Sequence, residues 1–140
     1  MNKFNISMIT IGIAISFSAM AEESMTKEAY KSEKERIELE YKSDKAKCQS
    51  LVDNAKDICK AEAKGKEEVA EAELDAKYKP SKKSQYKAHV AKAKADYNIA
   101  KEKCDDLTGK PNEVCHAEAK AAMIAAKADA KTQMKTSNGK

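Results

Sequence analysis

Hydrophobic and small residues recur along this chain at spacings of four and seven, and the positions between them are mostly Lys and Glu. On a helix that turns about 100° per residue, one such stripe lies within about 40° and consists of Tyr30, Ile37, Tyr41 and Cys48. A second stripe with the same spacing consists of Tyr86, Ala93, Tyr97 and Cys104. Spacings of four and seven combine into an eleven-residue repeat, which is typical of nearly straight helix pairs. Because both stripes are narrow and rich in Ala, they favour two helices lying close together over a wide bundle core.

Turn-forming residues divide this pattern, and we expect four helices at about 24–50, 54–77, 82–106 and 111–134. Pro80 and Ser81 separate the second helix from the third. Asp53 and Asn54 offer side chains that would cap the second helix. Gly109 fits the C-cap of the third helix.

The fourth helix has its own start signal in Pro111. Proline suits the first turn of a helix because its missing N–H would have no partner there. A helix, a turn and a second helix are therefore predicted in each half of the chain.

The two halves resemble each other at an offset of 56 residues. Without a gap, residues 41–64 align with residues 97–120, and the alignment superimposes Cys48 on Cys104 and Cys59 on Cys115. One helical hairpin used twice is the simplest explanation. We therefore divide the chain into a signal peptide at 1–21, a first hairpin at 22–85, and a second hairpin with a frayed tail at 86–140.

Composition supports helices and excludes several other classes. Residues 22–140 hold only 12 Leu, Ile and Val among 119, too few for a conventional compact core. Ala, Glu, Lys, Leu and Arg make up about 55% of them, a share typical of long helices and coiled coils. Four Gly and two Pro are too few for an all-β fold. We predict an all-α protein of two tandem, disulfide-clamped antiparallel helical hairpins, packed as a coiled coil or a loose four-helix arrangement.

Residues 1–21 have the pattern of a secretory signal peptide. Lys3 supplies a basic start, residues 6–17 are apolar, and Ala19-Met20-Ala21 fits a signal-peptidase site. Cleavage would leave Glu22 as the first mature residue. The alternative is an uncleaved anchor, but the apolar stretch is shorter than the roughly 18–20 residues that span a bilayer. We expect a soluble mature protein in the periplasm.

In that oxidising compartment the four cysteines are expected to form disulfides. Each half holds two cysteines that bracket a turn, so we predict the pairs Cys48–Cys59 and Cys104–Cys115, although four cysteines permit three connectivities. Closing each loop of about twelve residues contributes roughly 3 kcal/mol in the chain-entropy model. A zinc site would require closely spaced cysteine pairs, which are absent, and a haem motif or redox C-x-x-C is absent too.

Other chemistry has few candidate residues. His89 and His116 lie in different halves and have no matched acid or nucleophile, and there is no glycine-rich phosphate loop. We expect no enzyme activity and no cofactor. Seven lysines between Asp75 and Asp96 have no acid among them: Lys77, Lys79, Lys82, Lys83, Lys87, Lys92 and Lys94. The signal peptide argues against nucleic acid, so we interpret this run as a weak site for anionic lipid, lipopolysaccharide or an acidic protein; the alternative is a solvated helix junction.

These features together resemble a family of small proteobacterial envelope proteins often labelled cell envelope biogenesis protein TolA, or TolA-like. The resemblance rests on the signal peptide, on the unit Y-x6-C with C-x-A-E-A-K, and on Ala/Lys/Glu-rich helices, and it covers about residues 28–130. It implies a periplasmic helical protein. TolA itself is implied to have an inner-membrane anchor and a globular C-terminal domain, which this pattern does not match.

Two hypotheses of function follow. The first is a non-enzymatic envelope protein, a helical spacer that binds a protein partner or an anionic envelope surface. The second is a small stress-type chaperone, which should expose a concave apolar surface. Few side chains off the stripes would serve that purpose: Met25, Leu39, Val69, Ile99, Met123 and Ile124. The first hypothesis is therefore favoured.

Overall fold

The computed structural model describes residues 25–136, so the predicted signal peptide and its cleavage site lie outside the described residues. Within this range the chain forms α1 (Lys27–Lys47), a short 3-10 helix η1 (Cys48–Ser50), α2 (Asp53–Tyr78), α3 (Lys82–Cys104) and α4 (Lys110–Thr136). Every helix boundary lies within three residues of its predicted position. The prediction of an all-α fold is confirmed for the described residues.

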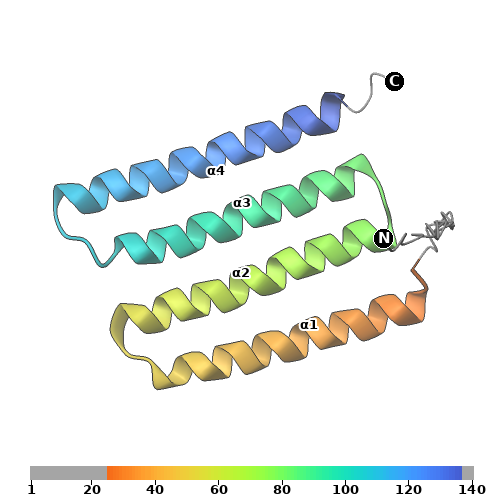
Figure 1. Ribbon diagram of the computed structural model, residues 1–140, viewed down its shortest axis with the longest axis horizontal. Helices are drawn as coiled ribbons and strands as arrows, with labels where there is room; N and C mark the ends of the chain where they lie inside the picture. The colour runs from red at the N-terminus through yellow and green to blue at the C-terminus, as the bar shows by residue number, and fades with distance from the viewer. Residues whose placement is uncertain (1–24, 137–140) are drawn as a thin grey trace, which may run out of the picture.

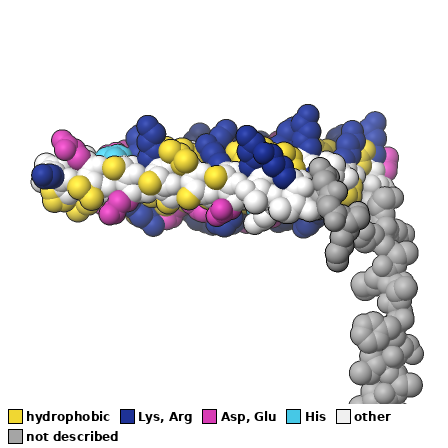
Figure 2. Space-filling model, turned by 90° about the horizontal axis from the view of Figure 1, so that it is seen from above, with side chains coloured by type: hydrophobic (Ala, Val, Ile, Leu, Met, Phe, Trp, Pro, Cys, Tyr) yellow, Lys and Arg dark blue, Asp and Glu magenta, His cyan; other side chains and the backbone are white. Residues whose placement is uncertain are grey.

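The helices lie side by side in one layer, in chain order, and each runs antiparallel to the next (Figure 1). Among the described residues, α1 contacts α2, α2 contacts α3, and α3 contacts α4, while helices further apart in the chain do not meet. Figure 2 shows that the layer is thin when seen along its plane. Each helix therefore has two broad exposed faces, and α1 and α4 each have one free edge.

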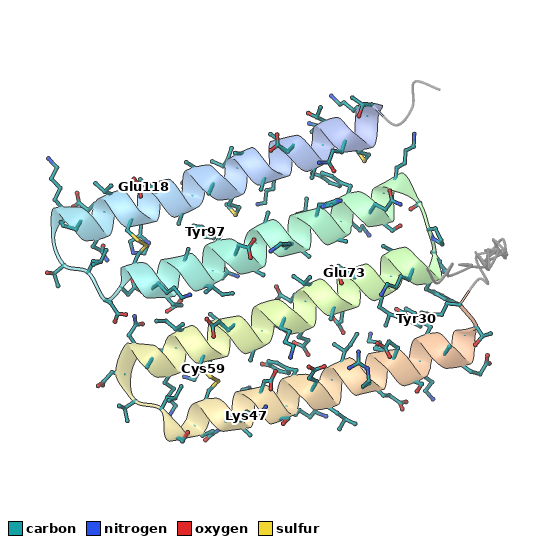
Figure 3. The ribbon with its side chains drawn as sticks, viewed as in Figure 1. Tyr30, Lys47, Cys59, Glu73, Tyr97 and Glu118 are labelled. Atoms are coloured by element: carbon teal, nitrogen blue, oxygen red, sulfur yellow. A yellow bond between two sulfur atoms is a disulfide. The ribbon has the colours of Figure 1, made fainter. Side chains whose placement is uncertain are left out.

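Two disulfides close the hairpins near their turns, and both are the predicted pairs. Cys48–Cys59 joins the end of α1 to α2, and Cys104–Cys115 joins α3 to α4, each with a Cα–Cα distance of 5.6 Å. Cys59 points from α2 toward α1 in Figure 3. Because each bridge sits beside its turn, it fixes the register of the two helices along their whole length.

The narrow core follows the predicted stripes. Of its eight buried hydrophobic residues, Ile37, Cys48, Ala93 and Cys104 belong to these stripes, and Ala63, Leu74 and Ala130 lie on the facing sides of α2 and α4. Ala95 is the exception, because it faces α2 and packs against Gly65. A Cβ atom placed on Gly65 would lie 2.9 Å from the Cβ of Ala95 and 3.7 Å from Cδ1 of Ile99. The two hairpins thus join through small residues at close range.

Two of the predicted caps are wrong. Val52 occupies the N-cap of α2 and makes no side-chain capping bond; instead, the Asn54 amide donates a 2.6 Å hydrogen bond to the Glu102 carbonyl of α3. Gly109, with φ +66°, directly precedes α4, and its carbonyl accepts from the N–H groups of Asn112 and Glu113. It therefore starts α4 and does not end α3.

The other turn predictions are confirmed. Pro111 lies in the first turn of α4. Ser81 caps α3 through a reciprocal capping box with Ser84, in which the Ser84 N–H donates to the Ser81 hydroxyl at 3.0 Å.

Candidate functional site

Lysines gather on one broad face of the second hairpin. On α3, Ala93 and Cys104 point toward α4, and residues about 80–120° further round the helix point to one side of the layer. On α4, residues about 80–120° further round from the side that faces α3 point to that same side of the layer, because a two-fold axis normal to the layer relates adjacent antiparallel helices. The residues selected form the lysine face: Lys83, Lys87, Lys94 and Lys101 of α3, with Lys120, Lys127 and Lys131 of α4. In Figure 2, Lys and Arg side chains project along the upper side of the layer.

The Cys104–Cys115 bridge sets these lysines opposite one another. Counting away from the bridge along two antiparallel helices, Lys101 lies within one turn of Lys120. The same count pairs Lys94 with Lys127, and Lys87 with Lys131. The lysine face is therefore a double row of ammonium groups along the hairpin.

Most of these charges have no neutralising partner. Six of the seven lysines form no ion pair with any other described residue, and the seventh, Lys101, has a Glu102 oxygen 3.6 Å from its Nζ. Five of the six are exposed, and Lys127 is half-buried. The acids on this side of the hairpin lie at its turn, where Asp105 contacts His116 at 2.9 Å and Glu113 stands in the first turn of α4. Along the helices, the face is positive without interruption.

The predicted basic run is only partly reproduced as a surface. Lys83, Lys87 and Lys94 belong to the lysine face, but helix geometry places Lys77 and Lys92 on the opposite side, where Lys92 contacts Asp96 at 3.0 Å. The remaining two lysines lie near the α2–α3 connection. The ammonium of Lys79 sits 5.5 Å from the centre of the Tyr78 ring, and Lys82 lines a small hollow with Tyr86 and His89.

Four members of the lysine face lie outside that run and were not predicted: Lys101, Lys120, Lys127 and Lys131. Their spacing of four and seven residues within α4 was a usable signal. Their meeting with the α3 lysines required the side-by-side geometry of two helices.

The first hairpin has paired charges between its helices, on the side of the layer opposite that of the lysine face. The Lys66 ammonium donates hydrogen bonds from α2 to Glu40 and to Asp44 of α1, the latter at 3.1 Å. Those bonds lower the pKa of Glu40, and bonds from Lys47 and then Lys66 lower the pKa of Asp44. Both carboxylates in turn raise the pKa of Lys66.

A second pairing closes the other end of the first hairpin. The Tyr30 hydroxyl donates a 2.7 Å hydrogen bond to Asp75, and the Tyr30 ring stacks on Tyr78 with centroids 4.3 Å apart. The hydrogen bond to Asp75 is the main reason that the pKa of Tyr30 is raised. These contacts hold α1 to α2 and leave their charges satisfied.

On the side opposite the lysine face, α3 and α4 enclose a shallow apolar groove of about 310 Å³, the α3–α4 groove. Its residues are Ala93, Asp96, Tyr97, Ala100, Ala119, Ala122, Met123 and Ala126. Each stands 56 positions after a residue that lines a groove of only about 30 Å³ between α1 and α2. The difference arises because Ala122 replaces Lys66, and Ala100 replaces Asp44.

Among residues 25–136, no three His, Cys, Asp or Glu side chains are placed so that they could hold a metal ion. In the same range no helix is both long and apolar enough to cross a membrane. Comparison of the chain with protein-family models, curated proteins and solved structures gives no match. The surface chemistry of the two hairpins is therefore the best indication of function.

Proposed function

We propose that this protein is a non-enzymatic periplasmic envelope protein that binds phosphate-bearing anionic envelope surfaces through the lysine face. The observation that carries the proposal is the double row of lysines, six of them without an ion-pair partner among the described residues. Exposed charges that have no internal partner contribute little to folding, so they are available to an external anion. A flat basic face suits a flat anionic surface, whereas a single phosphate ligand would favour a concave site.

The expected binding is weak and reversible. Each lysine near a strongly anionic membrane contributes about 1 kcal/mol, so six acting together give at most about 6 kcal/mol. That free energy corresponds to a dissociation constant between about 1 mM and 1 µM. Exposed charges interact over only about 8 Å at physiological ionic strength, so moderate salt should reduce the binding sharply.

Vesicle co-sedimentation tests the proposal directly. The mature protein should sediment with vesicles containing anionic phospholipid at low salt and should ignore neutral vesicles. Replacing Lys87, Lys94, Lys120 and Lys127 with Gln should abolish this preference. The matched control replaces four lysines away from the lysine face, Lys47, Lys77, Lys92 and Lys103, and changes the net charge equally.

Equal losses in the two variants would show that net charge alone is responsible and would contradict the proposal. Absence of binding by the unmodified protein at low salt would do so as well. Binding to an acidic protein but not to vesicles would support a protein partner instead.

Export is part of the same proposal, and the signal-peptide pattern of residues 1–21 supports it. The mature protein should begin at Glu22 and fractionate with periplasmic contents. Intact-mass measurement tests this, and a protein that still carries residues 1–21 would contradict it.

The α3–α4 groove favours a second candidate, a small periplasmic chaperone, because it is apolar and open. A chaperone should suppress the aggregation of an unfolded client at stoichiometric ratios. Replacing Met123 in the groove with Glu should then remove the suppression, while the lysine-face variant should retain it.

A further inference from the structure

The free edge of α4 is apolar, although no other described element covers it. Between Val114 and Ala128, the residues that point away from α3 on this helix form the α4 edge, which Lys110 and Lys135 flank at its two ends: Val114, Ala117, Ala121, Ile124, Ala125 and Ala128. None of the six is charged, all are exposed, and Val114 and Ile124 are 48% and 56% exposed. From Val114 to Ala128 the edge is about 21 Å long. Figure 2 looks onto this edge.

The same positions on α2 are already an interface within the chain. Residues 56 positions earlier form the side of α2 that α3 covers: Ile58, Ala61, Gly65, Glu68, Val69 and Ala72. At its centre Gly65 lies against Ala95 and Ile99 of α3. The α4 edge therefore repeats, with Ala121 in place of Gly65, a helix-binding surface that is occupied elsewhere in the molecule.

The free edge of α1 is different. Its outward positions form the α1 edge, which consists of Glu28, Ser32, Glu35, Leu39, Lys42 and Ala46. Three of the six are charged, and Leu39 stands 65% exposed among them. A polar outer side is how a layered helical array ends without associating. The α1 edge is thus polar enough to face solvent, whereas the α4 edge exposes an apolar helix surface.

We infer that the α4 edge pairs with the α4 edge of a second copy of this chain. The surface of α3 that binds the equivalent side of α2 is already buried in each molecule, and the α1 edge is charged. Among the described residues of a second copy, the exposed helix side that is apolar and built of small residues is its own α4 edge. A two-fold interface of this kind is self-complementary and closes at a dimer.

Charge and helix direction favour an antiparallel pair. Adjacent helices in the layer are all antiparallel, which also opposes their macrodipoles. Glu113 and Lys131 lie on the same flank of the α4 edge, near its opposite ends. An antiparallel pair brings Glu113 near Lys131 of the second copy, whereas a parallel pair places the Glu113 flanks of the two copies on opposite sides of the interface and loses this contact.

This geometry has a consequence for the whole assembly. A two-fold axis normal to the layer extends it from four helices to eight and keeps both lysine faces on the same side. Two such faces on one particle would engage an anionic surface together. The inference of a dimer is independent of the proposed binding to anionic surfaces, because the experiment that tests it contains no lipid.

The test is sedimentation velocity and equilibrium of the mature, disulfide-bonded protein over a wide concentration range. A monomer–dimer equilibrium is expected. Ala121→Glu places two like charges at the centre of the interface and should raise the dimer dissociation constant by about 30-fold or more. Glu is a good helix former at an exposed position, so circular dichroism should show unchanged helicity.

Leu39→Glu is the matched control, since it adds the same charge to the centre of the α1 edge and should leave the dimer unchanged. A photoreactive benzophenone amino acid at position 121 should crosslink to α4 of the second copy. A protein that stays monomeric at every concentration overturns the inference. So does a Leu39→Glu variant that dissociates as much as Ala121→Glu, or a crosslink that maps to α1.

Discussion

The two hairpins share a backbone plan and a disulfide position but differ in how their surfaces are satisfied. In the first, Lys66 bridges α2 to Glu40 and Asp44, and Tyr30 bonds Asp75. In the second, the position of Lys66 is Ala122, and six lysines have no ion-pair partner among the described residues. The first hairpin thus uses its polar groups to hold α1 to α2, whereas the second leaves lysines without ion-pair partners among the described residues and an apolar groove and edge exposed.

The buried core between α1 and α2 also has larger side chains than the core between α3 and α4. Ile37 and Leu74 fill the contact between α1 and α2, and the residues 56 positions later are Ala93 and Ala130. Burying Ile or Leu stabilises a contact by about 1.5–3 kcal/mol more than leaving it exposed, which Ala cannot match. The second hairpin should therefore depend more heavily on its disulfide than the first.

Removal of each disulfide should have the largest effect and tests this dependence. Replacing both cysteines of either pair with Ser should cost about 3 kcal/mol of unfolding free energy. Loss of Cys104–Cys115 should also loosen α4 from α3, because Ala93 and Ala130 stand where the first hairpin has Ile37 and Leu74, and should lower helicity by circular dichroism. The Cys48/Cys59 variant should keep most of its helicity, since Ile37, Leu74 and the ion pairs remain. Equal losses of helicity in the two variants would contradict the prediction that the second hairpin depends more on its disulfide than the first.

The next prediction exchanges one core position between the hairpins. Ile37→Ala gives the first hairpin the residue of the second and should cost about 2 kcal/mol in urea unfolding, at the low end for such a truncation because the core is thin. Ala93→Ile is the reciprocal change. The α3–α4 groove of about 310 Å³ beside Ala93 leaves room for the larger side chain, so this variant should be neutral or more stable. A marked loss of stability from Ala93→Ile would show that the groove is not available space.

A smaller effect is expected at the joint between the hairpins. Gly65→Ala gains about 1 kcal/mol of helix propensity but places a methyl group 2.9 Å from the Cβ of Ala95. That atom is fixed to the α3 backbone, so the helices must separate, and overpacking of this kind costs about 1–3 kcal/mol. We expect a net loss of about 1 kcal/mol in thermal unfolding. Adding Ala95→Gly should restore the close approach, and a double variant no more stable than Gly65→Ala would contradict this explanation.

Much of the fold was predictable because its signals are local. The stripes at spacings of four and seven located the helices, and two cysteines beside each turn predicted both bridges, which the structure confirms. The contact between hairpins was not predictable in the same way. It uses Gly65 and Ala95, which no stripe marks, together with Val69 and Ile99, which the sequence offered only as off-stripe hydrophobics.

The candidate site was predictable in part for a related reason. A run of lysines is visible in a sequence, but a helix distributes its members to different sides every few residues. Lys87 and Lys92 therefore point to opposite faces, while Lys94 lies near Lys127, more than thirty residues away. The failed cap at Asn54 has the same origin, since its partner is the Glu102 carbonyl of another helix. Contacts across the layer depend on register, which single-sequence patterns do not contain.

The smallest predicted effect concerns the ion pairs that distinguish the first hairpin. Lys66→Ala copies Ala122 and removes the hydrogen bonds to Glu40 and Asp44. Because the pKa values of both carboxyls are lowered in the folded protein, their contribution is present above their unfolded pKa values, near 4. It is lost as the pH falls through the lower, folded values. Unmodified protein should therefore lose more stability than the variant between pH 6 and pH 2.

Urea midpoints at several pH values measure this difference, which should shrink at high salt because the pairs are exposed. Lys77→Ala is a suitable control, because it removes another α2 lysine that forms no hydrogen bond or ion pair with a described residue and has only a lesser charge interaction with Glu33. It should follow the pH profile of the unmodified protein. If Lys66→Ala and Lys77→Ala had the same profile, the bridge would contribute no pH-dependent stability. The contrast between the hairpins would then rest on Ile37 and Leu74 in the core and on the unpaired lysines of α3 and α4.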